Sequence, residues 1–179
     1  MSRTASWLAL FPVFVFGLAG CGGASGSSSV QGSVGGKSFS EAHAVANVGG
    51  QAQRQSGLVI ISSASDICER VTANSEPTNA QLLTLQLREA DAAGNSSAPG
   101  HSGTYAITSN GSPTSGQFAW AFFVAVGAQT SDSSQMQASG GSVTLTDVAD
   151  GRYGGSFDLT FGSDHLTGSF DSSNCPALK

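Results

Sequence analysis

Charge is scarce in this chain, and the balance is negative. Only 11% of the 179 residues are charged, and 7 Lys and Arg stand against 12 Asp and Glu, a formal net charge of −5. Proteins that bind nucleic acid neutralise phosphates with clusters of Lys and Arg. The sequence holds no such cluster, so nucleic acid is not expected as a partner. The same shortage argues against electrostatic binding to anionic lipid headgroups.

Sequence signatures of catalysis and of metal binding are also missing. There is no Gly-x-Ser-x-Gly motif, so a nucleophile elbow is not predicted. A phosphate-binding loop would need glycine where Gln31 stands, before Gly36-Lys37-Ser38. No two histidines have the short spacing of a zinc site, and no Cys-x-x-Cys occurs, so neither a metal nor a cofactor is expected. All three histidines are expected at the surface: His43, His101 and His165.

The longest hydrophobic run is too short for a permanent membrane span. It extends from Trp7 to Gly20 and contains Pro12, whereas a transmembrane helix needs about 20 apolar residues. Arg3 precedes the run. A short cationic start followed by a short apolar run is typical of a secretory signal peptide. We therefore expect residues 1–20 to be a signal peptide.

The end of this run, Leu18-Ala19-Gly20-Cys21, resembles the lipobox of bacterial lipoproteins. The resemblance implies that the Cys21 thiol receives a diacylglyceryl group, and that a signal peptidase cuts before it. The new amino group is then acylated, with palmitate as the expected acid. Two or three acyl chains anchor a protein stably to a membrane. By analogy with enterobacterial lipoproteins, glycine at position 22 favours the outer membrane. The alternative is an ordinary secretory signal with an incidental cysteine.

Small residues follow the lipobox. Residues 22–29 are all Gly, Ala or Ser, a composition typical of flexible linkers. We expect residues 21–30 to be the lipidated cysteine and a tether, with a mean reach of roughly 15 Å. Residues 31–179 are then expected to form a single β domain, because this length suits one hydrophobic core.

Once Cys21 is modified, Cys68 and Cys175 remain as a pair. In the oxidising envelope an even pair predicts a disulfide. It would tie the last strand to the middle of the chain and close a loop of about 107 residues, worth about 4–5 kcal/mol on the chain-entropy model. The alternative is two free or metal-binding thiols.

Alternation of apolar and polar residues dominates the second half of the chain. Residues 153–161 and 166–170 alternate on either side of turn residues 162–164, which predicts a β-hairpin, and Gly-Ser-Phe-Asp occurs in both halves.

Residues 118–126 are apolar throughout and predict a central strand covered on both faces or, less favoured, a buried helix. A helix is expected at 66–72, capped by Ser65. Other strands are expected at 37–39, 42–48, 58–61, 82–87, 104–108 and 141–146.

Eight or nine short strands with one short helix predict an all-β fold, either an antiparallel β-sandwich or a small β-barrel. The order of features also resembles small lipoproteins of the myxobacteria. The shared features are the lipobox, a Gly/Ser tether, mid-chain Cys68, the strand Gly103-Thr104-Tyr105, a Gly-x-Phe-Asp hairpin and C-terminal Cys175. This resemblance implies no known activity.

The pattern favours a membrane-tethered, non-enzymatic envelope domain that binds an unidentified protein or small molecule, or has a structural role. A second hypothesis is a lipocalin-like carrier with an apolar ligand inside the barrel, around Trp120 and Phe122. A third is an envelope hydrolase, which needs His43 or His101 within hydrogen-bond reach of a serine and a carboxylate.

Overall fold

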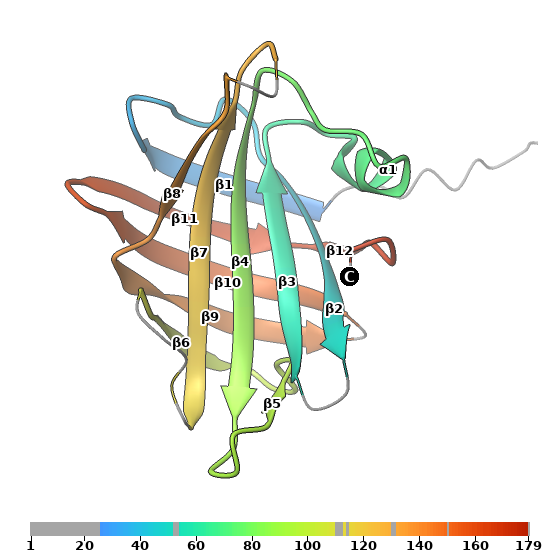
Figure 1. The fold of residues 1–179 in the computed structure, drawn as a ribbon, viewed down its shortest axis with the longest axis vertical. Coiled ribbons are helices and arrows are strands. Elements are labelled where there is room, and N and C mark those ends of the chain that lie inside the picture. The colour runs from blue at the N-terminus through green and yellow to red at the C-terminus, as the bar shows by residue number, and fades with distance from the viewer. Residues whose placement is uncertain are drawn as a thin grey trace, which may run out of the picture.

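The computed structural model describes residues 26–51, 54–109, 113, 115–129, 132–149 and 151–178. The predicted signal peptide and the predicted lipid-bearing Cys21 lie outside these ranges. The described elements are β1 Gly26–Ser33, β2 His43–Gln51, β3 Arg54–Ser62, α1 Ile67–Thr72, β4 Ala80–Ala90, β5 Ser96–Ser97, β6 Gly103–Ile107, β7 Gly116–Val126, β8 Ser134–Gln137, β9 Gly140–Ala149, β10 Arg152–Phe161, β11 Asp164–Asp171 and β12 Ser173–Asn174 (Figure 1).

Strand pairing closes into a ring. Ten strands follow one another in the order β1-β11-β10-β9-β6-β7-β4-β5-β3-β2, and β2 pairs back with β1. β3 also pairs directly with β4, so the two-residue β5 only extends the wall at one end. The all-β prediction is therefore confirmed, and the architecture is the barrel rather than the sandwich. Most pairs are antiparallel, but β6–β7, β3–β5 and β2–β12 are parallel.

The Gly/Ser segment supplies the closing strand, which corrects the expected tether. β1 runs beside β11 from Ser28 to Ser33 and meets β2 at Gly26 and Ser27. Residues 26–30 therefore belong to the barrel. The sequence concealed this strand because it has little apolar alternation, and only Val30 packs against the core. Its pairing comes from backbone groups that would otherwise be left unpaired at the edges of β11 and β2.

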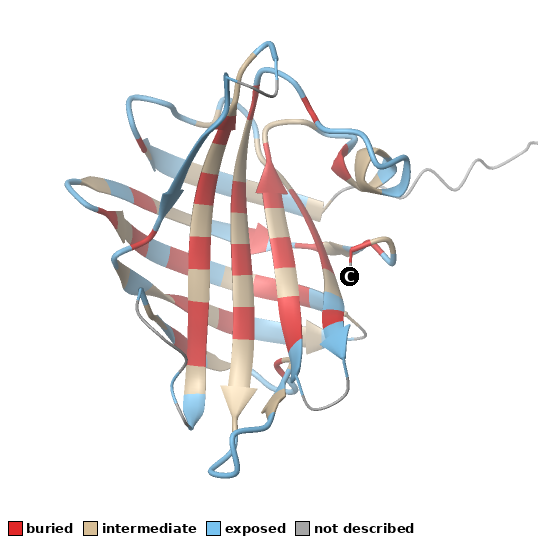
Figure 2. Ribbon diagram, in the orientation of Figure 1, coloured by how far each residue is buried: buried red, intermediate tan, exposed pale blue. Residues whose placement is uncertain are grey.

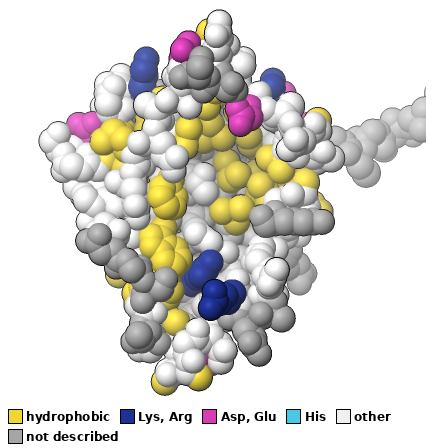
Figure 3. Space-filling model, viewed as in Figure 1, with side chains coloured by type: hydrophobic (Ala, Val, Ile, Leu, Met, Phe, Trp, Pro, Cys, Tyr) yellow, Lys and Arg dark blue, Asp and Glu magenta, His cyan; other side chains and the backbone are white. Residues whose placement is uncertain are grey.

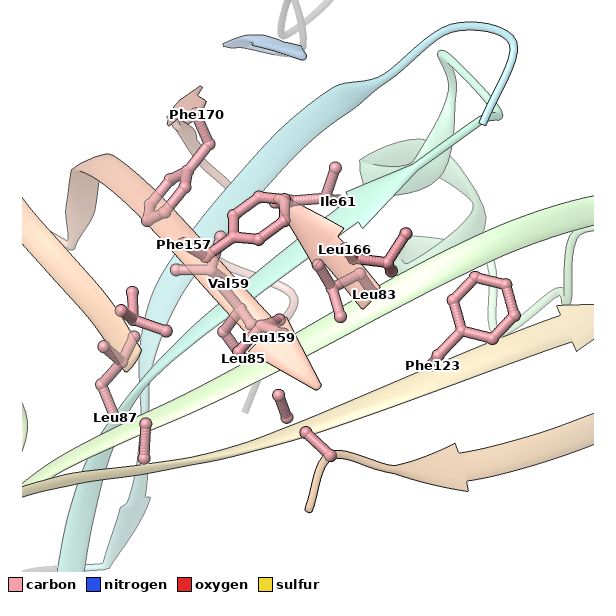
Figure 4. Close-up of a cluster of buried hydrophobic side chains, with 14 of the residues drawn as sticks. Val59, Ile61, Leu83, Leu85, Leu87, Phe123, Phe157, Leu159, Leu166 and Phe170 are labelled. Atoms are coloured by element: carbon pink, nitrogen blue, oxygen red, sulfur yellow. The ribbon is translucent and has the colours of Figure 1, made fainter. Parts of the chain in front are cut away.

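Buried side chains alternate along the strands and meet inside the barrel (Figures 2 and 4). The long strands of the barrel wall have one face toward the core, because successive side chains point to opposite sides of a sheet. Aliphatic and aromatic residues fill the centre: Val59, Ile61, Leu83, Leu85, Leu87, Tyr105, Phe123, Val143, Leu145, Phe157, Leu159, Phe161, Leu166 and Phe170. The interior is thus a packed hydrophobic core.

The predicted hairpin is confirmed as β10 and β11, and its repeated Gly-Ser-Phe-Asp has a packing role. Register places Gly155 opposite Phe170, and Phe157 opposite Gly168. The two phenylalanine rings stack with centroids 6.5 Å apart. Gly168 leaves space for the Phe157 ring, whereas Gly155 lies against the Thr144 backbone of β9. A Cβ at Gly168 would lie 2.6 Å from Phe157 Cζ and 2.1 Å from the Ser29 carbonyl oxygen of β1.

The burial of β7 differs from the sequence-based prediction. It occupies a central place beside β4, but only one of its faces is fully covered. Ala119, Ala121 and Phe123 are buried, whereas Trp120 and Phe122 between them are partly exposed. The prediction of a strand covered on both faces is wrong because a barrel wall has only one interior side.

Helix α1 lies outside the barrel wall (Figure 1). It begins one residue later than expected, and its N-cap is Asp66 rather than Ser65, with no side-chain capping bond. The Arg70 guanidinium instead donates to Asp66 at 2.9 Å and lowers the pKa of that carboxyl. Within the described ranges, no helix is long and apolar enough to cross a membrane.

Other strand predictions were incomplete. Residues 37–39 form no strand and contribute only a bridge between Val34 and Lys37. β8 was missed because all four of its side chains are exposed, so no alternation marks it. The two-residue strands β5 and β12 were also missed. β3, β4, β9 and β11 extend beyond their predicted ranges at both ends, whereas β2 and β6 each begin one residue away from the predicted start. The expected sequence order of the strands is otherwise confirmed.

We predict that Gly168→Ala destabilises the barrel by about 1–3 kcal/mol, because the new methyl group overpacks the Phe157 ring and the β1 backbone. The matched control is Gly140→Ala, where a Cβ meets nothing within 4 Å. Urea unfolding of both variants provides the measurement. Equal stabilities for the two would contradict the tight β1–β11–β10 packing.

Candidate functional site

The two remaining cysteines meet on the outside of the barrel. Their sulfur atoms lie 2.05 Å apart and their Cα atoms 5.7 Å apart, so the predicted Cys68–Cys175 pairing is confirmed. The bond joins α1 to the segment after β12. Cys175 belongs to a second apolar cluster with Val45, Ile67 and Leu178. The disulfide and this cluster fasten the helix and the C-terminal segment to the outer surface of β2.

The three histidines lie apart from one another, each beside a carboxylate. His165 Nε2 is 2.7 Å from Asp158 across the exposed face of β10 and β11. His43 lies on the outer side of β2, with Nε2 3.8 Å from Glu41 Oε2. The His101 side chain is 69% exposed in the loop before β6. The contacts shown for these rings are to carboxylates and one amide, rather than to a serine hydroxyl as a hydrolase would require.

A polar cluster closes one end of the barrel, and sequence reasoning missed it. Glu89 Oε1 accepts a 2.6 Å hydrogen bond from the Tyr105 hydroxyl and a 3.3 Å bond from Gln117 Nε2. His101 Nδ1 lies 3.6 Å from the same oxygen. We call these four residues the Glu89 cluster. One signal was present in the sequence: Glu89 continues the inward row of alternate residues in β4 that contains Leu87.

Both tyrosines of the chain lie beside this carboxylate and are fully buried. Burial, with a smaller contribution from the charge of Glu89, raises the pKa of Tyr153 to about 12. Burial and the hydrogen bond to Glu89 raise the pKa of Tyr105 far above its ordinary range. Gly57 makes room for the Tyr153 ring, because a Cβ there would lie 2.8 Å from the hydroxyl oxygen. The tyrosines are thus held neutral, and the cluster seals the end of the core.

Two surface pockets flank the short strand β5. One has a volume of about 400 Å³ and reaches Glu89, Asp91 and Ser97. The other, of about 250 Å³, is lined by Arg54, Arg88 and Phe118. Among the described residues, no three His, Cys, Asp or Glu side chains come together in a group that could hold a metal ion.

Hydrophobic side chains also lie on the outside of the barrel (Figure 3). Trp120, Phe122, Val124 and Val126 are partly exposed along β7, and we call them the outer strip. The carrier hypothesis placed Trp120 and Phe122 inside. That placement is wrong, because both alternate with buried alanines that face the core.

We predict that neither tyrosine ionises near pH 10 while the protein is folded. In the unfolded chain the tyrosine hydroxyls ionise near their ordinary pKa of about 10. The stability that the folded protein gains from keeping them neutral is therefore complete below pH 10 and is lost as the pH rises towards 12. Tyr153 alone accounts for roughly 3 kcal/mol over that interval. Absorbance at 295 nm, with and without urea, measures the ionisation. Tyrosinate appearing near pH 10 in the folded protein would contradict the buried cluster.

Replacing both Cys68 and Cys175 with alanine should lower the free energy of unfolding. The disulfide closes a loop with a sequence separation of 107, and the chain-entropy model gives about 4–5 kcal/mol for it. Urea unfolding of the variant and of the oxidised protein provides the comparison, and the same protein with a reductant serves as a control. Equal midpoints would show that the bond does not stabilise the fold.

Comparison with protein-family models, with curated proteins and with solved structures found no match to this chain. The chain's own residues therefore carry the functional inference. They comprise a filled barrel, a sealed end, an external disulfide, and an outer strip beside a pocket with two arginines.

Proposed function

We propose that this chain is a lipid-anchored protein of the bacterial cell envelope, which acts by binding or structural contact on the outside of its barrel. The proposal of external binding rests on the contrast between the two sides of β7. The inward side belongs to a packed core, whereas the outer strip remains partly exposed. A filled interior supports an external binding surface rather than an internal carrier cavity.

The anchoring half rests on the lipobox resemblance at Cys21. Only residues 22–25 separate Cys21 from β1. The span from Cys21 to Gly26 is at most roughly 17 Å when fully extended. A lipid on Cys21 would therefore keep the start of β1 close to the membrane surface. The tether in this proposal is shorter than the sequence alone suggested, because residues 26–30 belong to the barrel wall.

The disulfide supports an extracytoplasmic location. Bonds of this kind persist in the periplasm and at the cell surface, whereas cytosolic thiols are kept reduced. Cys68 and Cys175 are joined outside the barrel, and Cys68 is only partly buried, so reductants in the cytosol would act on this bond. Together with Gly22 after the lipid position, this supports the outer membrane as the proposed location.

Expression of the full chain in a Gram-negative bacterium tests the anchor. We predict that protein extracted from the membrane begins at Cys21 and carries a diacylglyceryl group and an additional acyl chain. The Cys21→Ser variant should remain uncut and without lipid, because the thiol is the acceptor of the diacylglyceryl group. Intact mass spectrometry distinguishes these forms. A protein cut elsewhere, or one without lipid, would contradict the anchoring proposal.

A further inference from the structure

Two arginines far apart in the sequence meet on the outside of the barrel. Arg88 lies directly opposite Phe118 in the β4–β7 pair, and Arg54 begins β3 opposite Ser96 of β5. Both arginines line the pocket of about 250 Å³ that also includes Phe118 and Pro113. We call this the arginine pocket. Figure 3 shows dark blue side chains grouped beside a band of hydrophobic surface in the lower part of this face.

These arginines carry positive charge without a carboxylate partner in the described part of the chain. Arg70 and Arg152, by contrast, form ion pairs with Asp66 and Asp171. The pocket therefore concentrates cationic charge on a protein whose formal net charge is −5. Asp91 lines the neighbouring pocket rather than this one. Its carboxylate accepts hydrogen bonds within its own turn, from Asn95 and from the Ala93 backbone N–H, and forms no ion pair with either arginine.

The guanidinium of Arg88 lies over the ring of Trp120. Its Cζ lies 5.2 Å from the centre of the Trp120 ring, a cation–π contact. The Nε atom is inaccessible to solvent and has no hydrogen-bond acceptor. A guanidinium that lies over an aromatic ring can still offer N–H groups to a planar or tetrahedral oxyanion.

An apolar surface continues from the charged end. Phe118 and Trp120 meet edge to face, with centroids 5.0 Å apart. Further along β7 the outer strip continues through Phe122, Val124 and Val126. A ligand whose anionic group sits at the arginines would thus place its remainder against aromatic and aliphatic side chains. This combination of charge and apolar surface fits an amphiphilic molecule better than an inorganic ion.

We infer that the arginine pocket binds the carboxylate or phosphate head group of an amphiphile whose apolar body lies along the outer strip of β7. This inference rests on the proposal that the protein acts by binding on the outside of its barrel. It is independent of lipid attachment at Cys21. Its test can therefore use residues 22–179, which retain every strand of the barrel.

Trp120 is the sole tryptophan of residues 22–179, so its fluorescence reports on this site directly. The probes are dodecanoate, dodecyl phosphate, dodecyl maltoside and dodecyltrimethylammonium, each below its micelle concentration. We expect saturable binding of the two anions, weakened by added salt. The neutral and cationic probes should bind at least about tenfold more weakly, since a lost charge-assisted contact costs about that factor or more. The order of the two anions then distinguishes a fatty-acid-like from a phospholipid-like head group.

Variants identify the residues responsible. Arg88→Gln and Arg54→Gln should each weaken anion binding about tenfold or more. Arg152→Gln removes a cation outside the pocket and serves as the matched control, with no loss expected. Arg88→Lys keeps the charge but loses the planar donor edge, and should also bind more weakly. Thermal unfolding confirms that each variant is folded. Equal binding of all four probes, no saturable binding of either anion, or unchanged affinity in both glutamine variants would overturn the inference.

Discussion

The structure depends on the pairing of β1 with β11 on one side and β2 on the other. These contacts are made by the backbone of a segment with almost no apolar side chains, in which Val30 alone reaches the core. Without them, β11 would leave a row of unpaired N–H and C=O groups at an open edge, and β2 would lose its pairs at His43 and Ala44. Closure removes those edges, and it also fixes which side of every strand is interior.

Once the barrel is closed, the available binding surfaces follow. The interior is filled by Leu, Phe, Val and Ile side chains, and the Glu89 cluster seals one end with two neutral tyrosines. Outside, α1 and the C-terminal segment cover part of β2 and β3 and are joined by Cys68 and Cys175. The outer side of β7 stays partly exposed and ends at the arginine pocket. The proposed binding function is therefore located on that side.

Local patterns in the sequence predicted what depends on neighbours along the chain. The hairpin of β10 and β11 and the helix near residue 67 were foreseeable in this way. The distant pair of Cys68 and Cys175 was foreseeable from the number of cysteines alone. Features that depend on closure were not. Residues 26–30 have the composition of a linker. They form a strand only because the edges of β11 and β2 pair with their backbone. Trp120 could not be assigned a side, since every residue of 118–126 is apolar. Arg54 and Arg88 are distant in sequence, and only the β3–β5–β4 arrangement brings them together.

Amide hydrogen exchange along β1 tests the central claim most directly. If the Gly/Ser segment closes the barrel, amides of residues 28–33 that pair with β11 exchange far more slowly than those of an unfolded peptide. Their protection should approach that of the hairpin strand β11 beside them, because both belong to one continuous ring. Exchange of residues 28–33 at the unfolded rate, with β10 still protected, would contradict the account. The segment would then be a tether, and the barrel would be open between β11 and β2.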